Sequence, residues 1–135
     1  AYRDYDRVRS TEAPLLESSG WSSDAATLIR FVGKITCIGG GDGPEAIEQA
    51  LQFVNELDLK PSRVLLFGDA PPHEEGQGSE VEYHKKVLET DYINECKQLK
   101  ASEIPLHTFY MHSRAKATFE KMAELTGGEA TELER

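Results

Sequence analysis

The sequence has few cysteines and no long apolar run. Cys37 and Cys96 are the two cysteines among 135 residues, and their spacing fits neither a disulfide framework nor a cysteine-based zinc site. Two reduced thiols are typical of an intracellular protein. No segment approaches the ~20 apolar residues of a membrane span, and no signal peptide is recognisable. We therefore expect a cytoplasmic chain that is not stapled by disulfides.

Basic residues are scarce relative to acidic ones. The chain has 15 Lys and Arg against 24 Asp and Glu, a net charge of −9. Residues 69–103 hold nine acids and four bases, so more than half of the excess lies in that segment. Binding to nucleic acid or to an anionic membrane needs clustered positive charge, so we expect neither as a partner. A cation or a basic protein surface fits this charge better.

The sequence does contain alternating helix and strand patterns, within a length that fits one domain. They predict helices over 24–35, 44–57, 92–101 and 113–125, and buried strands over 64–67 and 104–111. We expect Ser22 or Ser23 to cap the first helix, Pro44 to open the second and Ser113 to cap the last. The first helix carries one apolar stripe, formed by Leu28, Phe31, Val32 and Ile35. The alternation predicts an α/β fold, with a doubly wound, mostly parallel sheet in three layers.

Ligands of such sheets bind beyond the carboxyl ends of the strands, so the loops there carry the candidate site residues. Asp69 directly follows the strand over 64–67, and it is either a rigidly held ligand or a turn residue before two prolines. Asp42 lies in a glycine run and is either a hard oxygen ligand or an N-cap residue. Asp4 either lies near the same ligand-binding crevice, beyond the carboxyl ends of the strands, or is a solvated charge. The glycine run matches no phosphate or dinucleotide fingerprint.

Two histidines lie in an acidic segment of the sequence. His73 and His84 have Glu74, Glu75, Glu80 and Glu82 nearby, which allows a zinc site but fits a polar surface loop better. No His-Glu-x-x-His motif and no Gly-x-Ser-x-Gly elbow occurs. We therefore expect that this protein is not an enzyme.

Five motifs follow one another along nearly the whole chain. They are Tyr2-Arg3-Asp4-Tyr5, Trp21-Ser22-Ser23-Asp24, Ile38-Gly39-Gly40-Gly41-Asp42-Gly43-Pro44-Glu45-Ala46, Leu65-Leu66-Phe67-Gly68-Asp69-Ala70-Pro71-Pro72-His73 and Thr126-Gly127-Gly128. In this order they resemble the von Willebrand factor type A (vWA) domain, closest to the intracellular type found beside alpha-kinase domains. The resemblance implies a doubly wound sheet and a protein-interaction module.

The resemblance also implies a metal-ion-dependent adhesion site, in which Mg²⁺ keeps one position open for an acidic residue of a protein partner. Asp69 matches the aspartate of the third loop, Asp42 stands beside the threonine position of the second, and Asp4 lies near the same crevice. The resemblance gives Gly41, Gly43, Asp69 and His73 as partner-binding residues.

The first strand and the Asp-x-Ser-x-Ser loop after it do not occur in this sequence. We therefore expect a single domain over residues 1–135 that lacks its first βα unit, truncated upstream of Ala1. Its adhesion site is expected to be incomplete or vestigial, holding Mg²⁺ or Mn²⁺, or no metal at all. Two alternatives to the interaction module stay open. One is a metal-dependent hydrolase that uses Asp69, His73 and His84. The other is a structural or oligomerisation domain in which another chain supplies the missing strand, including a homo-oligomer formed by strand exchange.

Overall fold

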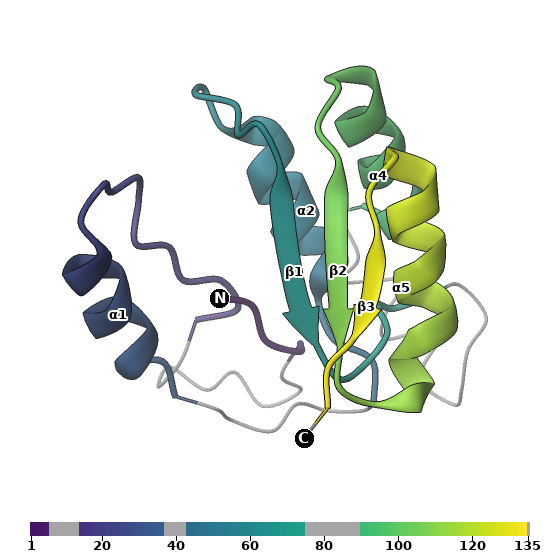
Figure 1. Cartoon of the computed structure of the whole chain (residues 1–135), viewed down its shortest axis with the longest axis horizontal. Helices are drawn as coiled ribbons and strands as arrows, with labels where there is room; N and C mark the ends of the chain where they lie inside the picture. The colour runs from purple at the N-terminus through teal and green to yellow at the C-terminus, as the bar shows by residue number, and fades with distance from the viewer. Residues whose placement is uncertain (6–13, 37–42, 75–89, 135) are drawn as a thin grey trace.

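A computed structural model describes residues 1–5, 14–36, 43–74 and 90–134 of the chain. Its elements, in chain order, are α1 (Ala25–Gly33), α2 (Ile47–Glu56), β1 (Val64–Gly68), α4 (Tyr92–Ala101), β2 (Leu106–Tyr110), α5 (Ser113–Thr126) and β3 (Ala130–Glu132). The three strands are parallel and lie in the order β1-β2-β3 (Figure 1). Helices alternate with parallel strands, so the predicted α/β class is confirmed. Within these residues, no helix is both long and apolar enough to cross a membrane.

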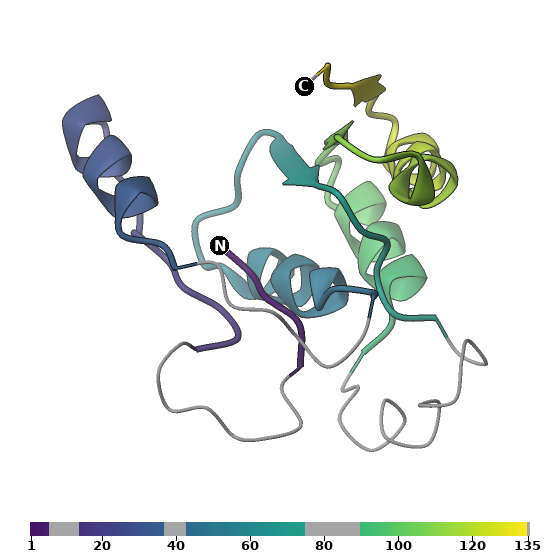
Figure 2. The same cartoon turned by 90° about the horizontal axis from the view of Figure 1, so that it is seen from below.

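Helices α2, α4 and α5 lie side by side on one face of the sheet (Figures 1 and 2). The core between them and the strands includes Leu51, Leu66, Leu106 and Phe119, each at most 6% exposed. Side chains alternate between the two faces of a strand. Leu65 and Phe67 of β1 therefore point to the opposite face, where each is about half exposed.

Several elements follow the predicted pattern. Helix α4 has the predicted range, and the Asp91 side chain caps it by accepting a hydrogen bond from the Asn94 N–H. Helix α5 ends at Thr126, and its C-cap residue, Gly127, has the left-handed φ of 78° that favours glycine. Strands β1 and β2 lie where the apolar runs predict them. Strand β3 has no such signal, because Ala-Thr-Glu is short and mostly polar, and it forms by pairing with β2.

The predicted helix starts were wrong at three places. Asp24, and not Ser22 or Ser23, caps α1 through a hydrogen bond from the Ala26 N–H, and His112 rather than Ser113 caps α5. Helix α2 begins at Ile47 instead of Pro44. For α2 the reason is tertiary, because the Glu45 and Ala46 N–H groups donate to the carbonyls of Pro71 and Arg3. These bonds tie residues 45 and 46 to neighbouring loops and keep Ala46 out of the helical conformation.

The N-terminal residues pair with a later extended segment. Tyr2 forms an antiparallel bridge with Leu16, and backbone hydrogen bonds join Arg3 N–H to Leu15 O and Glu17 N–H to Ala1 O, each at 2.9 Å. Beyond this pair stands α1, apart from the other helices (Figure 2). None of its residues is buried, so its apolar stripe does not face the core as the sequence pattern predicts. Phe31 and Val32 instead line an open groove beside β1.

Candidate functional site

Backbone hydrogen bonds bring three loops together at the carboxyl end of the sheet. The Ala46 N–H donates to Arg3 O, the Glu45 N–H donates to Pro71 O, and Glu45 forms a parallel bridge with Pro72. The segments that carry Asp4, Glu45 and His73 therefore meet, although they are far apart in sequence. This is the place where open α/β sheets bind their ligands.

Beneath this surface, His73 lies between two buried carboxylates. Its Nε2 is 3.0 Å from Asp4 Oδ1 and its Nδ1 is 3.3 Å from Glu48 Oε1, with all three side chains at most 2% exposed. The Tyr5 N–H also donates to Asp4 Oδ1 at 2.7 Å. Burial alone would lower the pKa of His73, but the hydrogen bonds and charges of Asp4 and Glu48 outweigh it and raise that pKa to about 10. The imidazole is therefore protonated at neutral pH, as a buried internal cation.

Asp69 lies at the surface of the same end. Its side chain is 51% exposed, and its Oδ2 is 3.5 Å from a guanidinium nitrogen of Arg114. The Arg114 Nε donates to the backbone carbonyl of Asp69 at 2.9 Å, so the arginine is held by two contacts with one residue. An ion pair this exposed is weak, and a charged ligand can compete for either partner.

The pKa of Glu45 reflects the negative electrostatic potential at this end of the sheet. Burial raises its pKa, the carboxylates of Asp4 and Asp69 raise it further, and His73 and Arg114 oppose them, leaving the pKa at about 7. Three acidic side chains thus act on one another here, and two nearby cations offset them only in part. We call Glu45 and Asp69, the two of these carboxylates that reach the surface, the acidic edge.

The predicted site residues separate into three groups. Asp4 and His73 are brought together, but in the buried cluster and not at the surface. Asp69 and Gly43 are exposed at the carboxyl end. Gly41, Asp42 and His84 lie outside the described residues.

Sequence reasoning missed Glu45, Glu48 and Arg114. Glu48 could have been found, because it lies beside Ile47 on the stripe of α2 that faces the core, where an ionised side chain needs a buried partner. Arg114 carries no such signal, since only the fold brings it to Asp69.

The residues that the structure describes do not fit the magnesium site that the resemblance implies. Within 1–5, 14–36, 43–74 and 90–134, no group of three or more His, Cys, Asp or Glu side chains could hold a metal ion. Of the three predicted ligands, Asp4 is buried against His73 and Asp69 faces Arg114. Both carboxylates already have a cationic partner, whereas Mg²⁺ needs carboxylate oxygens free to coordinate it.

Comparison with known proteins shows which sequences and which family this chain resembles. The chain is 28% identical over 142 residues to the putative ariadne-like RING finger protein R811 of Acanthamoeba polyphaga mimivirus. That alignment covers 98% of this chain but only 14% of the relative, so the chain spans about one seventh of that protein. No solved structure matches significantly. A family model described as von Willebrand factor A domain matches residues 12–135. With parallel strands, crossover helices and a family match over most of its length, this chain belongs to the von Willebrand factor A domain family.

Proposed function

We propose that this chain is a non-enzymatic protein-interaction module whose acidic edge binds a basic group of a partner protein. Domains of the vWA family are generally interaction modules, and the family match over residues 12–135 is the observation that carries this proposal. The acidic edge supplies the binding chemistry. Its charge agrees with the net charge of −9 and with the acidic excess that follows Asp69.

The state of Glu45 supports a cationic ligand. A carboxyl group with its pKa raised to about 7 is poorly compensated, and a positive charge placed beside it favours the ionised form. Asp69 offers a half-exposed carboxylate near it, which pairs with the exposed Arg114. A lysine or arginine of a partner can therefore replace Arg114 at Asp69 and neutralise Glu45 in one step.

We further propose that this interaction does not require Mg²⁺ or Mn²⁺. The sequence lacks the Asp-x-Ser-x-Ser loop, and the two described candidate ligands are engaged with His73 and Arg114. The competing proposal is an ion shared by Asp69 and Asp42, with an acidic residue of the partner completing its coordination.

The hydrolase alternative has less support. It needs His73 to reach a substrate or a catalytic metal, yet both ring nitrogens face carboxylates and the side chain is 2% exposed. A general base must lie within hydrogen-bond reach of the group it deprotonates.

A binding titration tests the interaction proposal. The probe is a labelled peptide of alternating lysine and serine, and fluorescence anisotropy at low ionic strength measures its Kd. Asp69→Asn should weaken binding about threefold to tenfold, and Arg114→Gln should strengthen it, because a competing cation is removed. Glu120→Gln, an exposed acid paired with Lys116 on α5, is the matched control and should change little. Equal effects of Asp69→Asn and Glu120→Gln would exclude the acidic edge as the binding site.

Thermal unfolding with added cation tests the metal proposal. A cation that binds the folded state alone raises Tm by mass action. We expect no rise specific to millimolar MgCl₂ or MnCl₂ over matched ionic strength. A rise that Asp69→Asn abolishes, together with Mg²⁺-dependent binding of an aspartate-rich peptide, would overturn this proposal in favour of the shared ion.

A further inference from the structure

Arg3 is a buried arginine whose guanidinium group donates to three different segments or side chains. Its side chain is 8% exposed. Its Nε donates to Thr36 O at 3.0 Å, its Nη1 to Pro14 O at 2.7 Å and its Nη2 to Glu17 Oε2 at 2.6 Å. Glu17 supplies the negative charge that a buried cation needs. The other two acceptors are backbone carbonyls, so the guanidinium fixes where two other segments of the chain lie.

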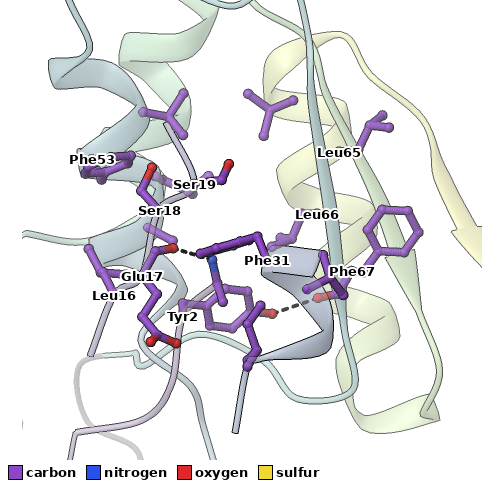
Figure 3. Close-up of a pocket in the computed structure, with 17 residues that line it drawn as sticks. Tyr2, Leu16, Glu17, Ser18, Ser19, Phe31, Phe53, Leu65, Leu66 and Phe67 are labelled. Atoms are coloured by element: carbon purple, nitrogen blue, oxygen red, sulfur yellow. Dashed lines mark hydrogen bonds between the residues drawn. The ribbon is translucent and has the colours of Figure 1, made fainter. Parts of the chain in front are cut away.

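The same residue joins the N-terminal segment to its extended neighbour. Tyr2 bridges Leu16, and the Arg3 N–H donates to Leu15 O at 2.9 Å. Leu16 and Glu17 lie beside Tyr2 (Figure 3). Backbone and side chain of Arg3 therefore hold one and the same neighbouring segment, and this fixes the position of the N-terminal residues.

Arg3 also fixes the chain before and after residue 45. Its side chain binds the carbonyl of Thr36, and its own carbonyl accepts from the Ala46 N–H at 3.2 Å. Ala46 directly follows Glu45 in the sequence. A shift of Arg3 would therefore move the backbone that carries the Glu45 carboxylate.

The loop that carries Asp69 is held by the same part of the molecule. The Glu45 N–H donates to Pro71 O at 2.9 Å, two residues after Asp69. Asp4, the neighbour of Arg3 in the sequence, pairs with His73 at 3.0 Å in the same loop. The spacing between the two carboxylates of the acidic edge therefore depends on the position of the N-terminal segment.

We propose that Arg3 is a positioning residue of the acidic edge, which fixes the Glu45 carboxylate relative to that of Asp69. Two carboxylates bind a basic group best when their spacing is set before the ligand arrives, because ordering them on binding costs free energy. This inference rests on the proposed function above. The effect of this positioning is opposite in sign to that of the Arg3 charge, since a positive charge near the site by itself weakens the binding of a basic ligand.

The first test measures the Kd of the lysine–serine peptide at pH 8, where Glu45, with its pKa of about 7, is mostly ionised. Arg3→Lys keeps the charge, but one ammonium group cannot reach three acceptors that are arranged around a guanidinium. We expect it to weaken binding about threefold to tenfold. Arg3→Gln should weaken binding as well. If Arg3 acted by its charge alone, Arg3→Gln would bind more tightly and Arg3→Lys would bind as wild type does.

Two control variants separate positioning from lost stability. Thr126→Val removes a buried hydroxyl that accepts from the Leu106 N–H at 2.9 Å, at the amino end of β2 and away from the acidic edge. It should lower Tm but leave the Kd within about twofold. Glu17→Gln keeps an oxygen that can accept from the guanidinium and leaves both carbonyl contacts of Arg3 in place. Its Kd should also stay within about twofold.

NMR gives a second readout, which does not depend on a ligand. In Arg3→Lys the Ala46 amide should exchange faster, and the pKa of Glu45 should fall toward its ordinary 4.5 as the carboxyl group becomes more exposed. Thr126→Val should leave this pKa unchanged. If the Arg3 variants do not fold, wild type supplies the test. Its Arg3 Nε–H should exchange slowly with water, and the Nε–H of Arg30, exposed on α1, should exchange rapidly.

Three results would overturn this inference: equal Kd values for wild type and Arg3→Lys, an unchanged Glu45 pKa in that variant, or rapid exchange of the Arg3 Nε–H in wild type. Equal weakening of binding by Thr126→Val and Arg3→Lys would also overturn it, because the effect would then follow stability alone. Failure of the proposed function looks different, since wild type itself would then not bind the lysine–serine peptide. In that case the Glu45 pKa in Arg3→Lys still decides whether Arg3 positions that carboxylate.

Discussion

His73 Nε2 lies 3.0 Å from Asp4 Oδ1, and both side chains are almost completely buried, 69 residues apart in sequence. With Glu48 on the other ring nitrogen, the imidazolium joins the N-terminal segment, α2 and the loop after β1. Buried charges are costly unless they are paired, so these three side chains depend on one another for their compensation.

Replacing His73 should destabilise the fold strongly. His73→Gln leaves Asp4 and Glu48 buried without their shared cation, and loss of one partner from a buried ion pair costs about 3–5 kcal/mol. Urea unfolding at pH 7 measures the free energy of unfolding. His107→Gln is the matched control, since the half-buried His107 accepts a single hydrogen bond among the described residues, from the Glu129 N–H, and it should cost about 1 kcal/mol. Adding Glu48→Gln to His73→Gln should recover part of the loss. Similar losses for both histidines would contradict this account.

Protonation of His73 should make stability depend on alkaline pH. Its pKa is raised from 6.5 to about 10 in the folded state, so the folded chain binds more protons than the unfolded chain between these values. The stabilisation is fully present below pH 6.5 and is lost as pH rises through about 10. The difference in unfolding free energy between wild type and His73→Gln should shrink over that window. A difference independent of pH would show that the imidazole is not charged.

Ionisation of Glu45 should make the stability of the fold depend on pH below neutrality, between 4.5 and about 7. Its pKa is raised from 4.5 to about 7, so the folded state again holds the extra proton between these values, and stability falls as pH rises across them. Glu45→Gln cannot ionise and should remove this fall, which makes the variant more stable than wild type at pH 8. Thermal unfolding at several pH values measures both. Parallel pH profiles for the two proteins would argue against the raised pKa.

Gly128 should not tolerate a side chain. A Cβ at this position would overlap the carbonyl oxygen of Leu106, a backbone atom in β2 that cannot move aside cheaply. Gly128→Ala should therefore destabilise by about 2–3 kcal/mol in urea unfolding. Gly33→Ala is the control, since a Cβ there meets nothing within 4 Å and alanine favours a helix by up to about 1 kcal/mol. Equal effects of Gly128→Ala and Gly33→Ala on the free energy of unfolding would contradict the close packing of the turn between α5 and β3 against β2.

Local patterns predicted the elements that depend on local chemistry. The apolar runs of β1 and β2 and the range of α4 each follow from a few neighbouring residues, and the structure confirms them. Predictions failed where distant segments compete for the same backbone groups. Helix α2 starts late because Pro71 and Arg3 take the N–H groups of Glu45 and Ala46, and β3 exists only through β2.

The sequence by itself therefore determined the family, the order of helices and strands, and the negative charge, because repeating patterns and composition are properties of the chain alone. The tertiary structure decided that Asp4 and His73 form a buried ion pair, that Asp69 meets Arg114, and that Phe31 and Val32 of α1 line an open groove beside β1. These relations join side chains many residues apart, and their distances are set by how the segments pack together and by which backbone groups they share.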